Sequence, residues 1–356
     1  QIPDLDAHII VLVNGRYDAE LSSVEDAADE VLIDNLASAA ETYPNLFNRH
    51  FGRYADPARE SFVALNTAFA RDGLFVYVPN GTVAKKPIHV IHLVQSDEPR
   101  LLQPRNLIVV GESSQVDLIE SFHTADGTES FTNGVTEIVV DANAHVDHYT
   151  LQLEGAGGSQ GYTTQVHQSD DSTFSTNTFT LDGAFTRNNL NVVVDGQNCE
   201  TNLYGLCLAK GSQHVDNHTV VDHAQPHCHS NELYRSILDD ESSGVFNGRV
   251  LVREDSQKID AFQSNKTILL TEEASIDTKP ELEIYADDVE CSHGATVGQL
   301  DDDALFYLRS RGVPEHRARV LLLYAFASDV VENIKIEPLQ SYVDKLVSAR
   351  LGGLGN

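Results

Sequence analysis

The chain has 356 residues, of which 41% are hydrophobic and 22% charged, a composition typical of a folded protein that excludes a disordered one. Its formal net charge is −30, from 54 acidic and 24 basic residues, and such a surface repels nucleic acid and anionic membranes. No apolar run approaches the roughly 18 residues of a membrane-spanning helix, so no membrane segment is expected.

The N-terminus and the cysteines indicate a cytoplasmic location. The first residues show neither the basic nor the apolar region of a signal peptide, and the missing initiator Met indicates that the native start is absent. The four cysteines are scattered and form no CxxC pair. Disulfides are therefore not expected in so large a chain, and free thiols in a reducing cytosol fit the pattern.

Residues 1–73 read as a small mixed α/β segment. Ile9–Val13 is a short apolar run that predicts a buried strand, and the following Asn14-Gly15 predicts a turn. Asp56-Pro57 predicts the start of a helix, with the aspartate as the cap and the proline in the first turn. The apolar residues of this helix fall at helical spacing: Phe62, Leu65 and Phe69.

Residues 74–298 lose the helical period and alternate short β-rich runs with small polar turns. Toward the end of this region four turns begin 14, 18 and 15 residues apart, at Asp239, Arg253, Thr271 and Ala286. We interpret one such interval as one coil of a solenoid. A β-sandwich also has many short strands, but the short repeat and the 7% aromatic content favour a parallel β-helix.

Residues 299–356 return to helix. Asp301–Asp303 places negative charge at a helix N-terminus, where the helix dipole favours it. Leu305 and Leu308 then face one side, and Gly312 and Pro314 end this helix and open the next. The second helix contains Val320–Ala327, which is apolar almost all round and therefore needs cover on more than one side. We expect a partner to supply part of that cover.

Two segments near the C-terminal end carry a long, specific pattern. Thr278–Gly298 reads TKPELEIYADDVECSHGATVG, and Leu305–Gly312 reads LFYLRSRG. Ser230–Tyr234 and Gly244–Gly248 fit the same pattern upstream. Together they resemble the SufB/SufD family of iron–sulfur cluster assembly scaffolds, over about residues 200–330. The CSHG at 291–294 is more similar to the SufD branch than to the SufB branch.

The resemblance implies a right-handed parallel β-helix between helical ends. It implies a scaffold without its own active site, which pairs with SufB through the last coils and binds the ATPase SufC through the C-terminal helices. The family's longer N-terminal helical region is expected to be incomplete in this chain. The residues expected at partner interfaces are Tyr285, Val289, His293, Leu305, Leu308, Leu322 and Phe326.

Cys291 and His293 are the candidate cluster ligands. They lie two residues apart, so on a strand their side chains project from the same face. Thiolate and imidazole are ligands that iron and iron–sulfur clusters accept, but two ligands cannot close a four-ligand site. The resemblance places His293 at the SufB interface, where a transient cluster would be shared between chains. A buried cysteine packed as a small hydrophobe and a structural histidine are the alternative, and for Cys291 both stay open. No cofactor is expected to bind the isolated chain tightly, and the isolated chain could self-pair as a homodimer.

Two other functions remain as alternatives. A stand-alone metal-binding protein could use a histidine-rich stretch, although its spacings match no standard zinc pattern: His214, His218, His223, His227, Cys228 and His229. A carbohydrate-active β-helix enzyme is the second alternative, but residues 74–298 are poor in lysine and no secretion signal is visible. No P-loop and no GxSxG motif occur. We therefore expect the chain not to be an enzyme.

Overall fold

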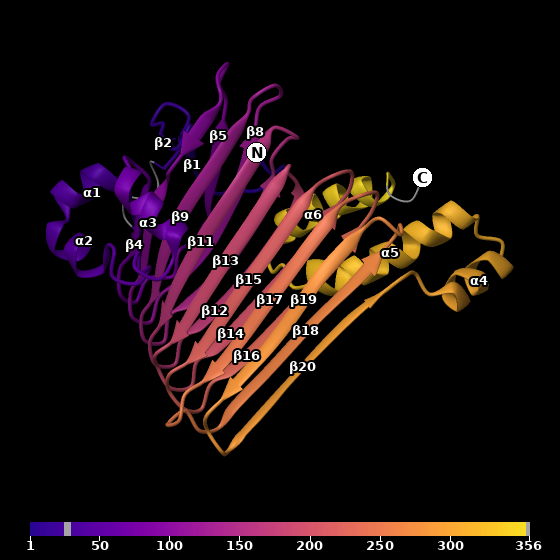
Figure 1. Ribbon diagram of the computed structural model, residues 1–356. Helices are drawn as coiled ribbons and strands as arrows, with labels where there is room; N and C mark the ends of the chain where they lie inside the picture. The colour runs from indigo at the N-terminus through magenta and orange to yellow at the C-terminus, as the bar shows by residue number, and fades with distance from the viewer. Residues whose placement is uncertain (25–29, 354–356) are drawn as a thin grey trace.

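A computed structural model of the chain describes residues 1–24 and 30–353. Its central feature is a parallel β-helix made of two long sheets, with helices at both ends of the chain (Figure 1). The first sheet runs in the order β2 (Arg16–Tyr17), β1 (His8–Val13), β5 (Ile88–Val94), β8 (Gln115–Thr124), β10 (His145–Leu153), β12 (Thr173–Asp182), β14 (Glu200–Ala209), β16 (His229–Leu238), β18 (Ile259–Leu269) and β20 (Val289–Gly298).

The strands of the second sheet stack along the same axis and are named here from the C-terminal end. Its strands are β19 (Ser275–Ile284), β17 (Ser243–Val252), β15 (His214–His223), β13 (Phe185–Val194), β11 (Gly158–Gln168), β9 (Ser130–Val140), β7 (Arg105–Val110), β4 (Leu74–Val78) and β3 (Leu32–Asn35), with the short β6 (Arg100–Leu102) beside β9. All ladder pairs between β4 and β20 are parallel, so the predicted β-helix is confirmed and the sandwich alternative is wrong.

One coil of the β-helix is about twice as long as the sequence interval suggested. His145 at the start of β10 pairs with Thr173 at the start of β12, and β11 of the other sheet lies between them in sequence. In the same way His214 of β15 pairs with Ser243 of β17. Each coil therefore contains two strands, one in each sheet, and two turns. The interval between successive turns is correct for one strand and one turn, but its interpretation as a full coil was wrong. Spacing alone does not reveal which strands are paired.

The stacked corners between the second and the first sheet explain the turn composition. Six of these corners, from β7–β8 to β17–β18, contain a residue in the left-handed region, which small polar side chains adopt most readily. These residues are Ser113, Asn143, Asp171, Asn198, His227 and Lys258, with φ between 56° and 62°. Backbone hydrogen bonds join each corner to the next, as from Asn143 N to Asp170 O (2.8 Å). Of the four turns read from the sequence, those at Arg253 and Ala286 lie at corners of this series. The turns at Asp239 and Thr271 lie in the other series, between the first and the second sheet.

The interior of the β-helix is apolar on one side and polar on the other. Inward-facing Val, Ile, Leu and Phe side chains form one continuous cluster along the coils. Beside it, the buried carboxylate of Glu120 accepts hydrogen bonds from His92 (3.1 Å) and His148 (2.9 Å). Burial alone would raise the pKa of Glu120, but these two imidazoles hold it at about 2. A buried charge is therefore paired inside the solenoid.

The N-terminal segment adds strands to both sheets. β1 continues the first sheet beside β5, and the predicted Asn14-Gly15 turn is confirmed, since both residues have positive φ between the antiparallel β1 and β2. Helices α1 (Leu36–Thr42) and α2 (Pro44–His50) pack on the outer face of the second sheet.

The predicted helix start at Asp56-Pro57 was wrong. Helix α3 is Ser61–Phe69, capped by Glu60. The side chain of Asp56 instead accepts a hydrogen bond from Ala58 N (2.9 Å), which fixes a local turn before the helix. The buried positions of α3 are Val63 and Asn66, whereas Phe69 is 63% exposed. The apolar spacing thus predicted the helix but not its buried face.

Glu137 fastens this segment to the solenoid. Its buried carboxylate on β9 accepts backbone N–H groups of Gly52, Tyr54 and Ala55 at 2.8 to 2.9 Å. Arg105 donates to the same carboxylate at 2.7 Å. Four donors on one buried carboxylate satisfy its charge and fix the loop between α2 and α3.

The C-terminal helices cover the outer face of the first sheet. α4 (Asp302–Ser310) begins at the predicted run of aspartates, is capped by Asp301, and is followed by α5 (Glu315–Val331) and α6 (Glu337–Leu351). Leu323 and Ala327 of α5 pack with α6 and with outward side chains of β10, β12, β14 and β16. The cover on this face therefore comes from the chain itself, rather than from a partner. No helix of the described residues is long and apolar enough to cross a bilayer.

Candidate functional site

The two sheets end at β19 and β20, and no further strand covers this end within residues 1–24 and 30–353. All ten residues of β20 are at least partly exposed. Figure 1 shows β20 as the last, orange strand of the stack, at the opposite end from the N-terminal helices. An uncovered edge strand presents unpaired backbone N–H and C=O groups, which can pair with another strand.

Cys291 and His293 lie on the inward-facing side of β20. Cys291 pairs with Ala261 of β18 and packs against the apolar interior, whereas the next inward residue, His293, is exposed. Their predicted placement on one face follows from the strand geometry. Burial raises the pKa of the Cys291 thiol, so the neutral thiol predominates at neutral pH. Cys291 thus packs as a small apolar side chain, while His293 is free to meet a partner.

Two buried polar residues follow His293 on the next two strands of the first sheet. Gln263 of β18 is its ladder partner, and Glu232 of β16 is the ladder partner of Gln263. Gln263 Nε2 donates to Glu232 Oε2 at 2.6 Å, and both side chains are almost fully buried. Burial raises the pKa of Glu232 to about 7. Sequence analysis missed this pair, although polar residues at two inward positions of apolar-in strands were a signal.

Gly248 makes room for this pair. A Cβ atom at Gly248 would lie 2.4 Å from Gln263 Nε2 and 2.8 Å from a ring carbon of Phe246. No side chain can occupy that space while Gln263 keeps its position. Gln263 Oε1 is buried and has no hydrogen-bond partner in the described part of the chain. An unused acceptor therefore lies one strand away from His293.

The other predicted interface residues lie either at the last two strands or on helices α4 and α5. Tyr285, directly after β19, is 63% exposed, and Val289 is half-buried against the interior. Leu305 of α4 is buried and Leu308 half-buried. Leu322 and Phe326 of α5 line a groove of about 390 Å³ beside Val297 at the end of β20.

Phe326 is also held inside the chain. Its ring lies 5.6 Å from the guanidinium of Arg235, which donates to Asp329 Oδ2 at 3.0 Å. The large apolar side chains that point away from the protein on α4 and α5 are different ones: Phe306, Tyr307 and Leu321, at 72%, 57% and 44% exposure. Tertiary packing decides which helix faces stay exposed, so the sequence did not single these residues out.

The histidine-rich stretch does not assemble a metal centre. No group of three or more potential ligands that could hold a metal occurs among the described residues. His223 is buried and lies 2.9 Å from Ser230 Oγ, while His214 and His218 are half-buried and lie near Ser243 Oγ (2.7 Å) and Asp216 (2.8 Å). Strand alternation places His214 and His218 on one face of β15 and the buried His223 on the other.

Comparison with protein families covers most of the chain. Residues 92–326 match the family model described as "SUF system FeS cluster assembly, SufBD core domain". The chain belongs to the SufBD family. Residues 1–90 match the "SufBD protein N-terminal region", so the family similarity begins well before residue 200, where the sequence pattern first became evident. Membership in the SufBD family gives the chain a role in iron–sulfur cluster assembly.

Several curated SufBD proteins are similar over most of their length. The chain is 34% identical to an iron–sulfur cluster assembly SufBD family protein of Synechocystis, over 98% of this chain and 79% of the relative. It is 31% identical to the iron–sulfur cluster assembly protein SufD of Escherichia coli, over 98% and 80%. SufD of Bacillus subtilis is 26% identical over 94% and 77%. Two of these three relatives carry the name SufD.

Proposed function

We propose that the chain is a non-catalytic scaffold subunit of a SUF assembly complex. It would pair with a SufB-like paralogue through its last coils and bind a SufC-like ABC ATPase through its C-terminal helices. A nascent iron–sulfur cluster would be held transiently between the two scaffold chains. The observation that carries this proposal is the open strand β20, with His293 exposed on its inward face.

The two edge strands are not equally suited to pairing. β19 carries Lys279 and Pro280 near its middle, and lysine and proline are residues that hinder edge-to-edge pairing. β20 contains neither residue type over its ten positions. β20 is therefore the better strand to continue a sheet into a second chain. The same edge would allow the isolated chain to pair with a copy of itself.

The ligands on this edge amount to half a site at most. His293 and Cys291 supply one imidazole and one thiol, so the partner must bring at least one thiolate. Gln263 Oε1 could accept the imidazole N–H that faces inward and leave the other ring nitrogen for iron. Such an outer hydrogen bond commonly fixes the ring of a histidine ligand.

The ATPase surface is best placed on the exposed apolar side chains of α4 and α5. Phe306, Tyr307 and Leu321 remain uncovered although α5 is already packed on the first sheet. Exposed apolar groups close together mark protein–protein surfaces. Leu322 and Phe326 then support this surface from inside, because each is half-buried in the chain itself.

The cluster role is tested in the reconstituted complex with the paralogue and the ATPase. We compare His293→Ala and Cys291→Ser with His145→Ala, an exposed histidine at the start of β10. Iron and sulfide are counted per complex after assembly. His293→Ala should form the complex but lose cluster build-up, whereas His145→Ala should behave as wild type. Normal cluster yield from an intact His293→Ala complex contradicts the ligand role.

The ATPase surface is tested by capture of the ATPase. The double variant Phe306→Asp/Leu321→Asp should abolish capture and keep the wild-type thermal midpoint, since both side chains are exposed. Val83→Asp places the same charge on an exposed position near the N-terminal end, where Val83 is 60% exposed, and should leave capture unchanged. If the folded double variant captures the ATPase as well as Val83→Asp does, docking occurs elsewhere.

A further inference from the structure

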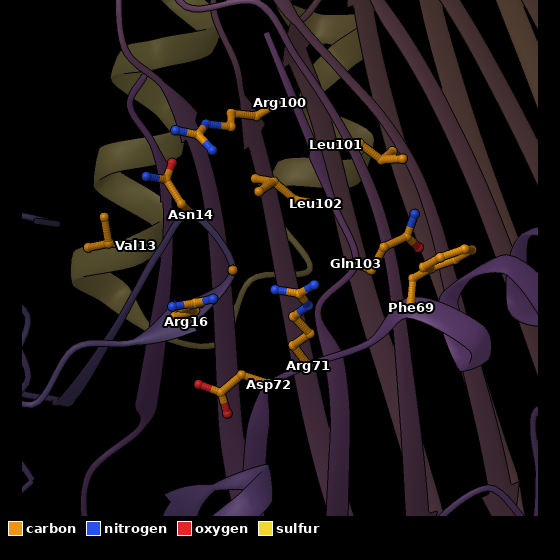
Figure 2. A pocket seen from close by; sticks show the side chains of 11 residues that line it. Val13, Asn14, Arg16, Phe69, Arg71, Asp72, Arg100, Leu101, Leu102 and Gln103 are labelled. Carbon is orange, nitrogen blue, oxygen red and sulfur yellow. The ribbon is translucent and has the colours of Figure 1, made fainter. Parts of the chain in front are cut away.

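A pocket of about 540 Å³ lies at the N-terminal end of the molecule, at the other end of the solenoid from β20. Three segments that are distant in sequence meet there: the β1–β2 turn (residues 13–16), the connection from α3 to β4 (residues 69–72), and β6 with the residue after it (residues 100–103). Figure 2 shows side chains from all three segments around one space. The pocket draws on both matched family regions.

The charge of this pocket is opposite to that of the chain. Arg16, Arg71 and Arg100 line it, and Asp72 is the single carboxylate among the described residues of its lining. The chain as a whole carries 54 acidic and 24 basic residues, so three arginines at one small site are a local exception. Like charges gathered around one space repel each other. A bound anion would relieve that repulsion.

The three guanidinium groups are available to a ligand. In the described part of the chain none of them forms an ion pair, and all three residues are exposed. Among the described residues, the guanidinium of Arg100 makes one hydrogen bond, from Nε to Ser96 Oγ at 2.8 Å. Asp72 is engaged through Oδ2 with Tyr17 N at 3.2 Å. In Figure 2 the side chains of Arg16, Arg71 and Arg100 lie around the turn that carries Asn14.

The wall between these arginines is rigid. Asn14 and Gly15 adopt positive φ of 50° and 74°, which sets the tight turn between β1 and β2. The Asn14 side chain makes two hydrogen bonds of 3.0 Å with the backbone of Gln95, one as donor and one as acceptor. A preformed wall lowers the entropy cost of binding a ligand.

We propose that this pocket binds a small organic diphosphate. Guanidinium groups bind phosphate oxygens through paired N–H donors, and several of them suit a multiply charged anion. Phe69 and Leu101 in the pocket lining are exposed, and Leu102 is buried. The pocket therefore also offers apolar contacts to the organic part of the ligand. The volume lies within the roughly 300–1,000 Å³ of small-molecule sites. This site is independent of the cluster site at β20.

Calorimetric titration of the full chain tests the proposal, with inorganic pyrophosphate, ADP and adenosine as probes in low-salt buffer. Pyrophosphate and ADP should bind with one-to-one stoichiometry, and ADP should bind more tightly because of its apolar part. Adenosine should not bind measurably. Arg71→Ala should weaken binding by about tenfold or more, and Arg71→Lys by less, since lysine keeps the charge but not the paired donors.

Arg53→Ala is the matched control, because Arg53 is an exposed arginine outside the pocket. It should leave the affinity unchanged. Equal weakening by Arg53→Ala and Arg71→Ala, or titrations that do not saturate, would mean general attraction of anions and would overturn the proposal. His293→Ala should bind pyrophosphate as wild type, so failure of the cluster proposal and failure of this one give different results.

Discussion

Gln263 is the ladder partner of His293, and its amide nitrogen donates a 2.6 Å hydrogen bond to Glu232 one coil further inside. Gln263 and Glu232 are almost fully buried, and the pair fills an inward position where the strand pattern would otherwise place apolar side chains. A buried polar pair therefore lies next to the open edge strand β20. Two predictions test how much this pair contributes to stability.

Gln263→Leu should lower the free energy of unfolding by about 1–3 kcal/mol, because the buried carboxyl of Glu232 loses its donor. Glu232→Leu/Gln263→Leu should recover most of that loss, since neither polar group is then left buried alone. Urea denaturation followed by circular dichroism measures both, as the chain has no Trp. If the double variant is as unstable as the two single losses combined, the pair is not an energetic unit.

Glu232→Gln should stabilise the protein at pH 8 but hardly at pH 4.5. Burial raises the pKa of Glu232 from 4.5 to about 7, so the folded state binds this proton more tightly than the unfolded state. The cost of burying the ionised form is absent below about pH 4.5 and complete above about pH 7, where it is on the order of 3 kcal/mol. Paired denaturation curves at the two pH values measure the difference. Glu290→Gln, on exposed β20, should show no such difference, and a stabilisation by Glu232→Gln that is equal at both pH values would contradict the account.

Glu137→Ala should release the loop between α2 and α3. The substitution removes the acceptor of three backbone N–H groups and leaves Arg105 buried without its carboxylate, at a cost of about 3–5 kcal/mol. Hydrogen exchange at Gly52, Tyr54 and Ala55 should accelerate before that of the solenoid strands. Glu137→Gln keeps one acceptor oxygen and should fall between wild type and Glu137→Ala. Unchanged exchange at these amides in Glu137→Ala would show that other contacts hold the loop.

Gly134→Ala should destabilise the protein by about 1–3 kcal/mol through overpacking. A Cβ atom at Gly134 would lie 2.0 Å from a ring carbon of Tyr162, the residue opposite it in the ladder. The tyrosine hydroxyl bonds to Asn106 (2.9 Å) and Thr136 (3.0 Å), so the ring cannot move without breaking those bonds. Gly161→Ala is the control, because its nearest neighbour would lie at an ordinary 3.5 Å. Equal thermal midpoints for the two variants would rule out this steric cause.

The fold class was predictable because its signals are local. Turn residues at Asn143 and Asn198, the aspartate cap of α4 and the shared face of Cys291 and His293 all depend on neighbours in sequence. Coil length was not predictable, since it depends on which strands pair, and each strand pairs with the next but one along the chain. The anchor at Glu137 and the arginine pocket both join segments that lie far apart in sequence. Local sequence patterns carry no information about contacts between segments that are distant in sequence.

The two ends of the solenoid differ in the length of their edge strands. At the N-terminal end its sheets stop in the short antiparallel strands β2 and β3, of two and four residues, which offer little backbone for pairing. If two chains joined through their last coils, with β19 as well as β20 covered, only such short ends would stay exposed. Such a pair would have no long edge left to recruit a third chain, so the stack would close at two members. In such a pair, growth into a fibre, the usual hazard of a long open β-edge, would be blocked by the architecture of the first coil.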